Sequence, residues 1–271
     1  AALRNETDYI FGPDMGTDET CMAWVKDEIG RSVGLPRAIG GIPLDEIGAT
    51  AWGLYHAAVV AASFMDLPLV GARVAIQGFG AVGKHAARFL VEHGATLVAA
   101  SDSTGTIHDP AGLDLPTLIA LKEGGRSVVD YAEGEKLSRD DIIDLPCEIW
   151  IPAARPDVIR EDNVDRLKTK LILQGANIPF TEGAEQMLHR RGVVVIPDFI
   201  ANAGGVICAA MEYHGATESV AMATIEERLR ANTRQVLEVA TGHGISPRQA
   251  ALQIAAARVK QSMGYRRWGV Y

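Results

Sequence analysis

The chain has 271 residues, of which 48% are hydrophobic and 22% are charged. This balance is typical of a folded globular protein with one large or two modest domains, and it excludes disordered and collagen-like chains. The formal net charge of −8 repels polyphosphate backbones, so we expect no nucleic-acid partner, although backbone amides could still bind one small phosphate.

The predicted elements alternate between helices and strands. Helices are expected over 17–30 and 44–64, before the first strand. Five nearly continuous apolar runs follow, as is typical of strands covered by helices on both faces: Arg73–Gln77, Thr96–Ala100, Glu148–Ile151, Lys170–Leu173 and Val193–Ile196. Further helices are expected from Val82, over 115–122, from an N-cap at Thr181, and over 217–241 and 247–263. The alternation predicts an α/β fold with a doubly wound, Rossmann-type, mostly parallel sheet and flanking N- and C-terminal helices.

Membrane, redox and metal signals are weak. The longest apolar run, 57–65, is too short to span a bilayer, so no membrane association is expected. Cys21, Cys147 and Cys208 are widely spaced, as buried thiols are in a reducing compartment, and we expect a cytoplasmic protein. The histidines show no metal-ligand spacing, so no metal site is expected.

A glycine-rich loop follows the first predicted strand: Gly78-Phe79-Gly80-Ala81-Val82-Gly83. It leads into an amphipathic helix, which is the context in which such a loop binds the diphosphate of a dinucleotide. In this pattern Gly78 permits the tight turn, Gly80 lets backbone amides approach the diphosphate, and Gly83 lets the helix pack close to the sheet. We therefore predict that these six residues bind the cofactor; a glycine turn without a ligand is the alternative.

Ser101 and Asp102 end the second predicted strand. Asp102 lies 19 residues beyond Gly83, close to the spacing of about 20 expected for the acid that binds the adenosine ribose. A carboxylate there accepts hydrogen bonds from the 2′-hydroxyl and repels a 2′-phosphate, and no Arg or Lys lies between residues 95 and 121. The sequence therefore favours NAD. NADP stays possible because Ser101, Ser103 and Thr104 could bind a phosphate, or a distant arginine could fold in.

Further motifs occur in one order along the chain: Gly12-Pro13-Asp14-Met15-Gly16-Thr17, Gly40-Gly41 with Gly48-Ala49-Thr50, the Gln77–Gly83 loop, Ser101-Asp102-Ser103, Ile151-Pro152-Ala153-Ala154, Gly175-Ala176-Asn177 and Asn202-Ala203-Gly204-Gly205-Val206. With these motifs the chain resembles the cofactor-binding half of the glutamate/leucine/phenylalanine/valine dehydrogenases. The resemblance implies a homo-oligomeric, NAD(P)-dependent enzyme. Its reaction would be the reversible oxidative deamination of an L-amino acid to a 2-oxo acid and ammonia.

The resemblance also implies roles for single residues. Asp14 matches the family's catalytic aspartate, a proton carrier, although the bare sequence reads equally as a loop acid or helix cap. The positions that match the nicotinamide side of the cleft are Thr50, Ala153, Ala154, Asn177 and Asn202. The positions that match the substrate site are Asn202, Gly205 and Ala209. Without the resemblance, Asn177 and Asn202 could be turn formers.

Two departures from the family pattern affect the expected activity. The family's N-terminal substrate domain carries a glycine-flanked catalytic lysine and a lysine that holds the substrate α-carboxylate, and no lysine of this chain has a Gly-Gly-Lys context. We therefore expect the isolated chain to bind a dinucleotide without turning over substrate. Glutamate-specific members carry a serine where this chain has Ala209, which favours an apolar amino acid while glutamate stays open.

We divide the chain into three parts. Residues 1–66 form a hinge and helical segment with the Asp14 loop, 67–200 the dinucleotide-binding domain, and 201–271 the substrate-cleft loop and C-terminal helices that pack back. Two other functions stay open: a non-catalytic dinucleotide-binding or regulatory module, and a different Rossmann dehydrogenase whose substrate domain is built from the terminal helices.

Overall fold

A seven-stranded sheet forms the centre of the computed structural model, which describes residues 5–265; residues 1–4 and 266–271, the outer ends of the first and last predicted parts, lie outside it. The strands are β1 (Arg73–Gln77), β2 (Thr96–Ser101), β3 (Thr106–His108), β4 (Glu135–Leu137), β5 (Ile149–Pro152), β6 (Leu171–Leu173) and β7 (Val194–Ile196). Their order is β4-β3-β2-β1-β5-β6-β7. The five predicted strands pair in parallel and β3 and β4 add an antiparallel edge, which confirms the mostly parallel sheet.

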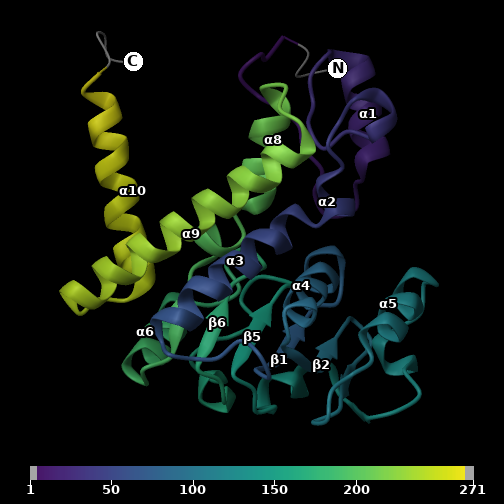
Figure 1. Cartoon of the computed structure of the whole chain (residues 1–271), viewed down its shortest axis with the longest axis vertical. Helices are drawn as coiled ribbons and strands as arrows, with labels where there is room; N and C mark the ends of the chain where they lie inside the picture. The colour runs from purple at the N-terminus through teal and green to yellow at the C-terminus, as the bar shows by residue number, and fades with distance from the viewer. Residues whose placement is uncertain (1–4, 266–271) are drawn as a thin grey trace.

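Helices surround the sheet. The α-helices are α1 (Glu19–Ile29), α2 (Leu44–Ile47), α3 (Ala49–Phe64), α4 (Ala81–Glu92), α5 (Leu115–Glu123), α6 (Glu182–Arg190), α7 (Asp198–Ala201), α8 (Gly204–Tyr213), α9 (Glu218–His243) and α10 (Pro247–Met263). Short 3₁₀ helices are η1 (Arg37–Ile39), η2 (Val128–Asp130), η3 (Arg139–Asp144) and η4 (Val164–Arg166). Figure 1 shows the sheet at one end of the molecule, α3 and α9 crossing beside it, α1 and α8 beyond, and α10 projecting on the other side.

Both faces of the sheet are buried, as the continuous apolar runs predict. In β1, Val74 and Ile76 join a core with residues of α3 and α4, whereas Ala75 faces the opposite core. That second core holds Trp150, fully buried, with residues of α6, η3 and η4. Because side chains alternate along a strand, each strand fills both cores at once.

The apolar stretch over 44–64 forms two helices, α2 and α3, rather than the single predicted helix. They meet at Gly48, which has a φ of +74°, and a Cβ there would lie 2.6 Å from the His85 ring, so glycine is strongly favoured. By length and composition the stretch could cross a membrane, but 67% of its most hydrophobic window is buried in the protein. It is therefore a core segment, and α3 packs against α4, α8 and α9.

The sequence does not predict β3, β4 or α8. β3 and β4 have three residues each, too few for a periodic signal. The helix α8 begins with Gly204 and Gly205, which have poor helix propensity. Glycine is needed at Gly204 because a Cβ there would lie 2.1 Å from the Ala49 carbonyl oxygen. The close approach of α8 to α3 therefore explains a helix start that propensity disfavours.

Candidate functional site

A cavity of about 360 Å³ lies at the carboxyl ends of β1, β2 and β5. The chain leaves β1 for β2 on one side and reaches β5 on the other, which makes this edge the switch point where open α/β sheets bind ligands. Seven of the predicted cofactor residues line the cavity: Gly78, Phe79, Gly80, Ser101, Asp102, Ala153 and Ala154. The fold therefore brings residues that follow three different strands together around one cavity.

Each glycine of the loop has a separate geometric reason. Gly78 has a φ of +94°, and a Cβ on it would lie 2.8 Å from Ala153 main-chain atoms. A Cβ on Gly83 would lie 2.0 Å from the Gly78 carbonyl oxygen, whereas at Gly80 nothing lies within 4 Å. Gly78 and Gly83 are therefore required by the fold itself. Gly80 faces open space, which leaves room for a ligand to approach the main chain.

The start of α4 offers unpaired amides to that space. Gly80 is the N-cap of α4 and no side chain caps the helix, so its first N–H groups stay available and carry partial positive charge. The two preceding amides, of Gly78 and Phe79, donate to the Ser101 carbonyl at 3.0 and 2.7 Å, which fixes the loop to β2. The Phe79 ring is buried in the core, so Phe79 meets the cavity through its main chain.

Asp102 is held by four protein donors. Its carboxylate accepts Lys122 Nζ at 2.7 Å, Ser127 Oγ at 2.9 Å, and the main-chain N–H groups of Val128 and Thr104 at 2.9 Å each. Burial raises the pKa of this carboxyl, but the hydrogen bonds, with Lys122 first, outweigh burial and lower it to about 2. Asp102 is therefore ionised and already paired, and its contact with a ribose stays a prediction.

Three cations line the cavity: Lys122 from α5, Arg139 from η3, and Arg155 after β5. Lys122 pairs with Asp102, the one acidic residue in the lining, and Arg139 and Arg155 both pair with Asp140 beside it, at 3.1 and 3.7 Å. Three cations thus face two carboxylates, which leaves a small local excess of positive charge in an acidic protein. The sequence names none of the three, although it leaves open that a distant arginine folds in, as Arg139 and Arg155 do. Lys122 lies one residue beyond the stretch 95–121, which holds no Arg or Lys.

The predicted nicotinamide-side residues continue from the end of β5. The main-chain amides of Gly175 and Ala176 donate to the Pro152 carbonyl at 2.9 and 2.8 Å. Asn202 Nδ2 donates to Asn177 Oδ1 at 2.7 Å and to the Gly175 carbonyl at 3.3 Å. The two asparagines are thus joined to each other and to the loop beside Ala153, although neither lines the cavity itself.

Thr50 and Gly205 meet where α8 crosses the start of α3. A Cβ on Gly205 would lie 2.6 Å from Thr50 Oγ1, so the two predicted residues are neighbours. Ala209, one turn further along α8, packs half-buried against the core formed by residues of α2, α8 and α9.

Asp14 lies apart from the cavity lining. It is exposed on the loop before α1, where its Oδ1 accepts the Met15 N–H at 2.7 Å and its own N–H donates to Thr17 Oγ1 at 2.8 Å. The partial burial that would suit a general acid is not present around it in this structure. Among residues 5–265, no group of three or more His, Cys, Asp or Glu side chains could hold a metal ion.

Comparisons with known proteins identify the family and the fold. The model of the Glutamate/Leucine/Phenylalanine/Valine dehydrogenase family matches residues 40–267. The chain is 38% identical over 279 residues to a glutamate dehydrogenase of Aeropyrum pernix and 34% identical over 275 residues to an NAD-specific glutamate dehydrogenase of Staphylococcus aureus; each alignment covers 96% of this chain and 66% of the relative. The solved hetero-hexameric glutamate dehydrogenase of Thermus thermophilus, in its Leu-bound form, superposes with a TM-score of 0.86 at 27% identity, covering 97% of this chain and 65% of that chain.

The chain thus spans about two thirds of the length of these relatives. The matched segment includes the glycine loop, all three cavity cations and both asparagines. The chain belongs to the glutamate/leucine/phenylalanine/valine dehydrogenase family.

Proposed function

We propose that this chain is the cofactor-binding portion of an NAD(P)-dependent amino-acid dehydrogenase, which oxidatively deaminates an L-amino acid to a 2-oxo acid and ammonia. The observation that carries the proposal is the open space at Gly80, between the uncapped start of α4 and Ala153 at the switch point. Family membership supports the reaction class.

The cavity residues fit a dinucleotide. The first-turn amides of α4 can bind diphosphate oxygens, and Lys122, Arg139 and Arg155 can balance the phosphate charge. The bound nicotinamide supplies a hydride acceptor for the substrate Cα. In this proposal the joined Asn177 and Asn202 orient the nicotinamide half.

The proposed roles in proton transfer and substrate recognition rest on the resemblance of the surrounding loops to the family; the family model matches residues 40–267, which include Asn202 and Gly205 but not Asp14. Asp14 is the proposed proton carrier, acting as general acid and base on the amine. Asn202 and Gly205 are proposed to face the substrate.

Calorimetry tests the proposal on the 271-residue chain. Titration with NADH should give saturable binding, and addition of glutamate with NAD to the chain alone should produce no NADH. Absence of heat with NAD, NADH and NADPH would overturn the cofactor assignment. Steady turnover by the chain alone would overturn its assignment as a cofactor-binding portion. The alternative of a non-catalytic module predicts the same binding but no turnover by the intact native protein.

We propose that the adenosine end of the cavity, the part around Asp102 and Lys122, accepts a cofactor with a 2′-phosphate as well as one with a 2′-hydroxyl on the adenosine ribose. Lys122 neutralises Asp102 at 2.7 Å, so the repulsion expected from a lone carboxylate is reduced. Arg139 and Arg155 share the single carboxylate of Asp140, so together they add one net positive charge to the lining. The substitution Lys122→Met should weaken NADPH binding by about ten-fold and NADH binding by less than about three-fold, because a 2′-phosphate gains most from a nearby cation. Equal losses for both cofactors in calorimetric titrations would refute this assignment.

Two substrate classes are supported by different observations. The names of the relatives favour glutamate, whereas Ala209 offers no hydroxyl to a distal carboxylate, which favours an apolar amino acid. A substrate panel on the intact native enzyme separates them. Strong preference for glutamate would show that groups other than the side chain at position 209 recognise the carboxylate.

We also propose that the intact enzyme is a homo-oligomer. The Thermus structure is named a hetero-hexamer, which supports assembly in this fold. Light scattering on the native enzyme should give the mass of several subunits, and a monomeric mass would contradict the proposal.

A further inference from the structure

A buried polar cluster joins the first turn of α10 to the carboxyl ends of β6 and β7. Arg248 Nε donates to Glu185 Oε2 at 2.9 Å, and its Nη2 donates to Gln174 Oε1 at 2.8 Å and to Asp198 Oδ1 at 3.0 Å. Gln174 Nε2 also donates to Glu185 Oε2 at 3.1 Å, and its Oε1 accepts the Asp198 N–H at 3.0 Å. One guanidinium thus holds two carboxylates and an amide, all three of them buried.

Asp198 extends this cluster to both predicted nicotinamide-side asparagines. Its Oδ2 accepts the N–H of Ile178 at 2.8 Å, the residue that follows Asn177. Ile178 has a φ of +49°, a conformation that a β-branched residue adopts only when its surroundings enforce it. The Asp198 carbonyl accepts the Asn202 N–H at 2.8 Å. The Asp198 carboxylate therefore fixes the backbone beside Asn177, and its main-chain carbonyl makes the last helical bond of α7, to Asn202, whose side chain in turn donates to Asn177.

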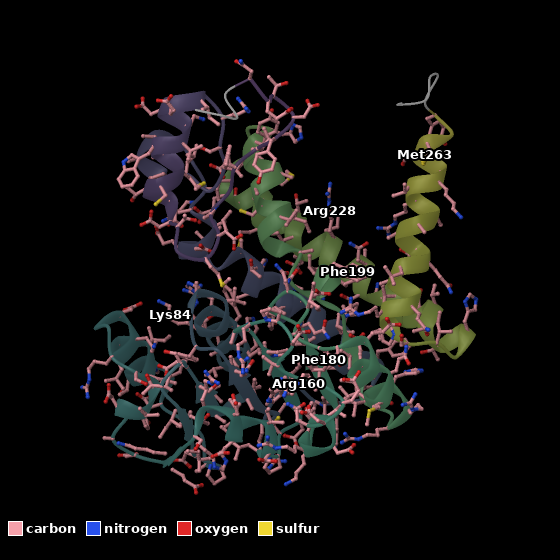
Figure 2. All side chains as sticks on the ribbon, turned by 180° about the vertical axis from the view of Figure 1, so that it is seen from behind. Lys84, Arg160, Phe180, Phe199, Arg228 and Met263 are labelled. Atoms are coloured by element: carbon pink, nitrogen blue, oxygen red, sulfur yellow. The ribbon has the colours of Figure 1, made fainter. Side chains whose placement is uncertain are left out.

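The arginine is well suited to hold that aspartate. Its planar fork can serve Glu185 and Asp198 together, which a lysine cannot do with the same geometry. The guanidinium also lies 5.5 Å above the ring of Phe199, on α7. Figure 2 labels Phe199 in the middle of the molecule and shows α10 extending away from it toward Met263. Only the first turns of α10 contribute buried residues, so this cluster lies at the point where the helix meets the body.

We propose that Arg248 is a positioning residue for the nicotinamide half of the cofactor. Acting through Asp198, it holds the hydrogen-bonded pair of Asn177 and Asn202 beside the end of β5. It touches neither the glycine loop nor the cations of the adenosine end. The inference rests on the proposed dinucleotide site and adds a residue that acts on one half of it.

The test compares two probes, NADH and ADP-ribose, which share the diphosphate and adenosine but differ in the nicotinamide. In calorimetric titrations, Arg248→Met should raise the Kd for NADH by about ten-fold or more. It should leave the Kd for ADP-ribose within about two-fold, because the α4 amides are unaffected. Arg248→Lys keeps the charge and should give an intermediate loss for NADH. A merely structural role would change the two Kd values equally or leave both unchanged, and either result would overturn the inference.

Arg73→Met is the matched control. Arg73 makes a similar two-bonded pair with Glu148, at 3.0 and 2.8 Å. This pair lies at the amino end of β1, whereas the cavity lies at the carboxyl ends of the strands. This variant should bind NADH and ADP-ribose as the unchanged chain does. If Arg248→Met does not fold, Asp198→Asn and Arg248→Lys carry the comparison, with the same selective loss of NADH expected. Failure of the unchanged chain to bind either probe would instead overturn the proposed function.

Discussion

Replacing Gly80 with valine should weaken NADH binding by at least about 100-fold, about 2.7 kcal/mol, without lowering the stability of the free protein. Nothing lies within 4 Å of the Cβ position at Gly80, and its φ of −90° and ψ of −157° suit a β-branched residue. The added side chain would stand where the diphosphate must approach the α4 amides. Calorimetry measures the affinity and thermal denaturation the stability.

Two further variants separate this effect from packing. Gly242→Val also adds a side chain in open space, outside the cavity lining, and should leave NADH binding unchanged. Gly83→Ala should lower the melting temperature, because its Cβ would lie 2.0 Å from the Gly78 carbonyl oxygen. Unaltered NADH affinity in Gly80→Val would show that the ligand does not use this loop.

Replacing Asp102 with asparagine should lower the free energy of unfolding by about 2 kcal/mol at neutral pH. Burial raises the pKa of this carboxyl, but hydrogen bonds from Lys122, Val128 and Thr104, together with that of Ser127, lower it from 3.8 to about 2. Asparagine loses the charge that pairs with Lys122 and places an N–H among these donors. Urea denaturation of both proteins at several pH values gives the difference.

The sign of the pH dependence follows from the lowered pKa. The contribution of Asp102 is fully present above the ordinary pKa of 3.8 and is lost as the pH falls toward about 2. The stability difference between the two proteins should therefore shrink in acid. Glu123→Gln, at an exposed ion pair with Lys84, should change stability by less than about 1 kcal/mol. A difference that is constant with pH would mean that Asp102 stabilises through packing rather than through its charge.

The sequence predicts the sheet well because its parallel strands are buried on both faces. β1 begins and ends at the predicted residues, and the N-cap at Thr181 and the helix 247–263 are confirmed. The antiparallel strands β3 and β4 are not predicted because each has three residues, and those of β4, Glu135–Leu137, are largely exposed, so neither has a distinctive pattern. The break at Gly48 between α2 and α3 is not predicted because its cause lies in another element: the His85 ring of α4 leaves no room for a Cβ at position 48.

In the candidate site, too, the local motifs are predicted from the sequence and the long-range contacts are not. The sequence predicts the glycine loop because each glycine has a local role next to a strand and a helix. It does not predict that Lys122, from α5, pairs with Asp102. It also does not predict the pair of Arg248 with Asp198, because the two residues lie 50 positions apart along the chain. Long-range pairs between charged side chains leave no periodic signal in one sequence. Such pairs set the charge around Asp102, where the adenosine is proposed to bind, and the geometry proposed for the nicotinamide end.

A crystal structure of the chain with NADH tests the central claim most directly. The diphosphate should lie within hydrogen-bond distance of the first-turn amides of α4, over Gly80, with the adenosine ribose near Asp102 and Lys122. A nucleotide bound at another part of the sheet, or with its diphosphate away from α4, would contradict the account.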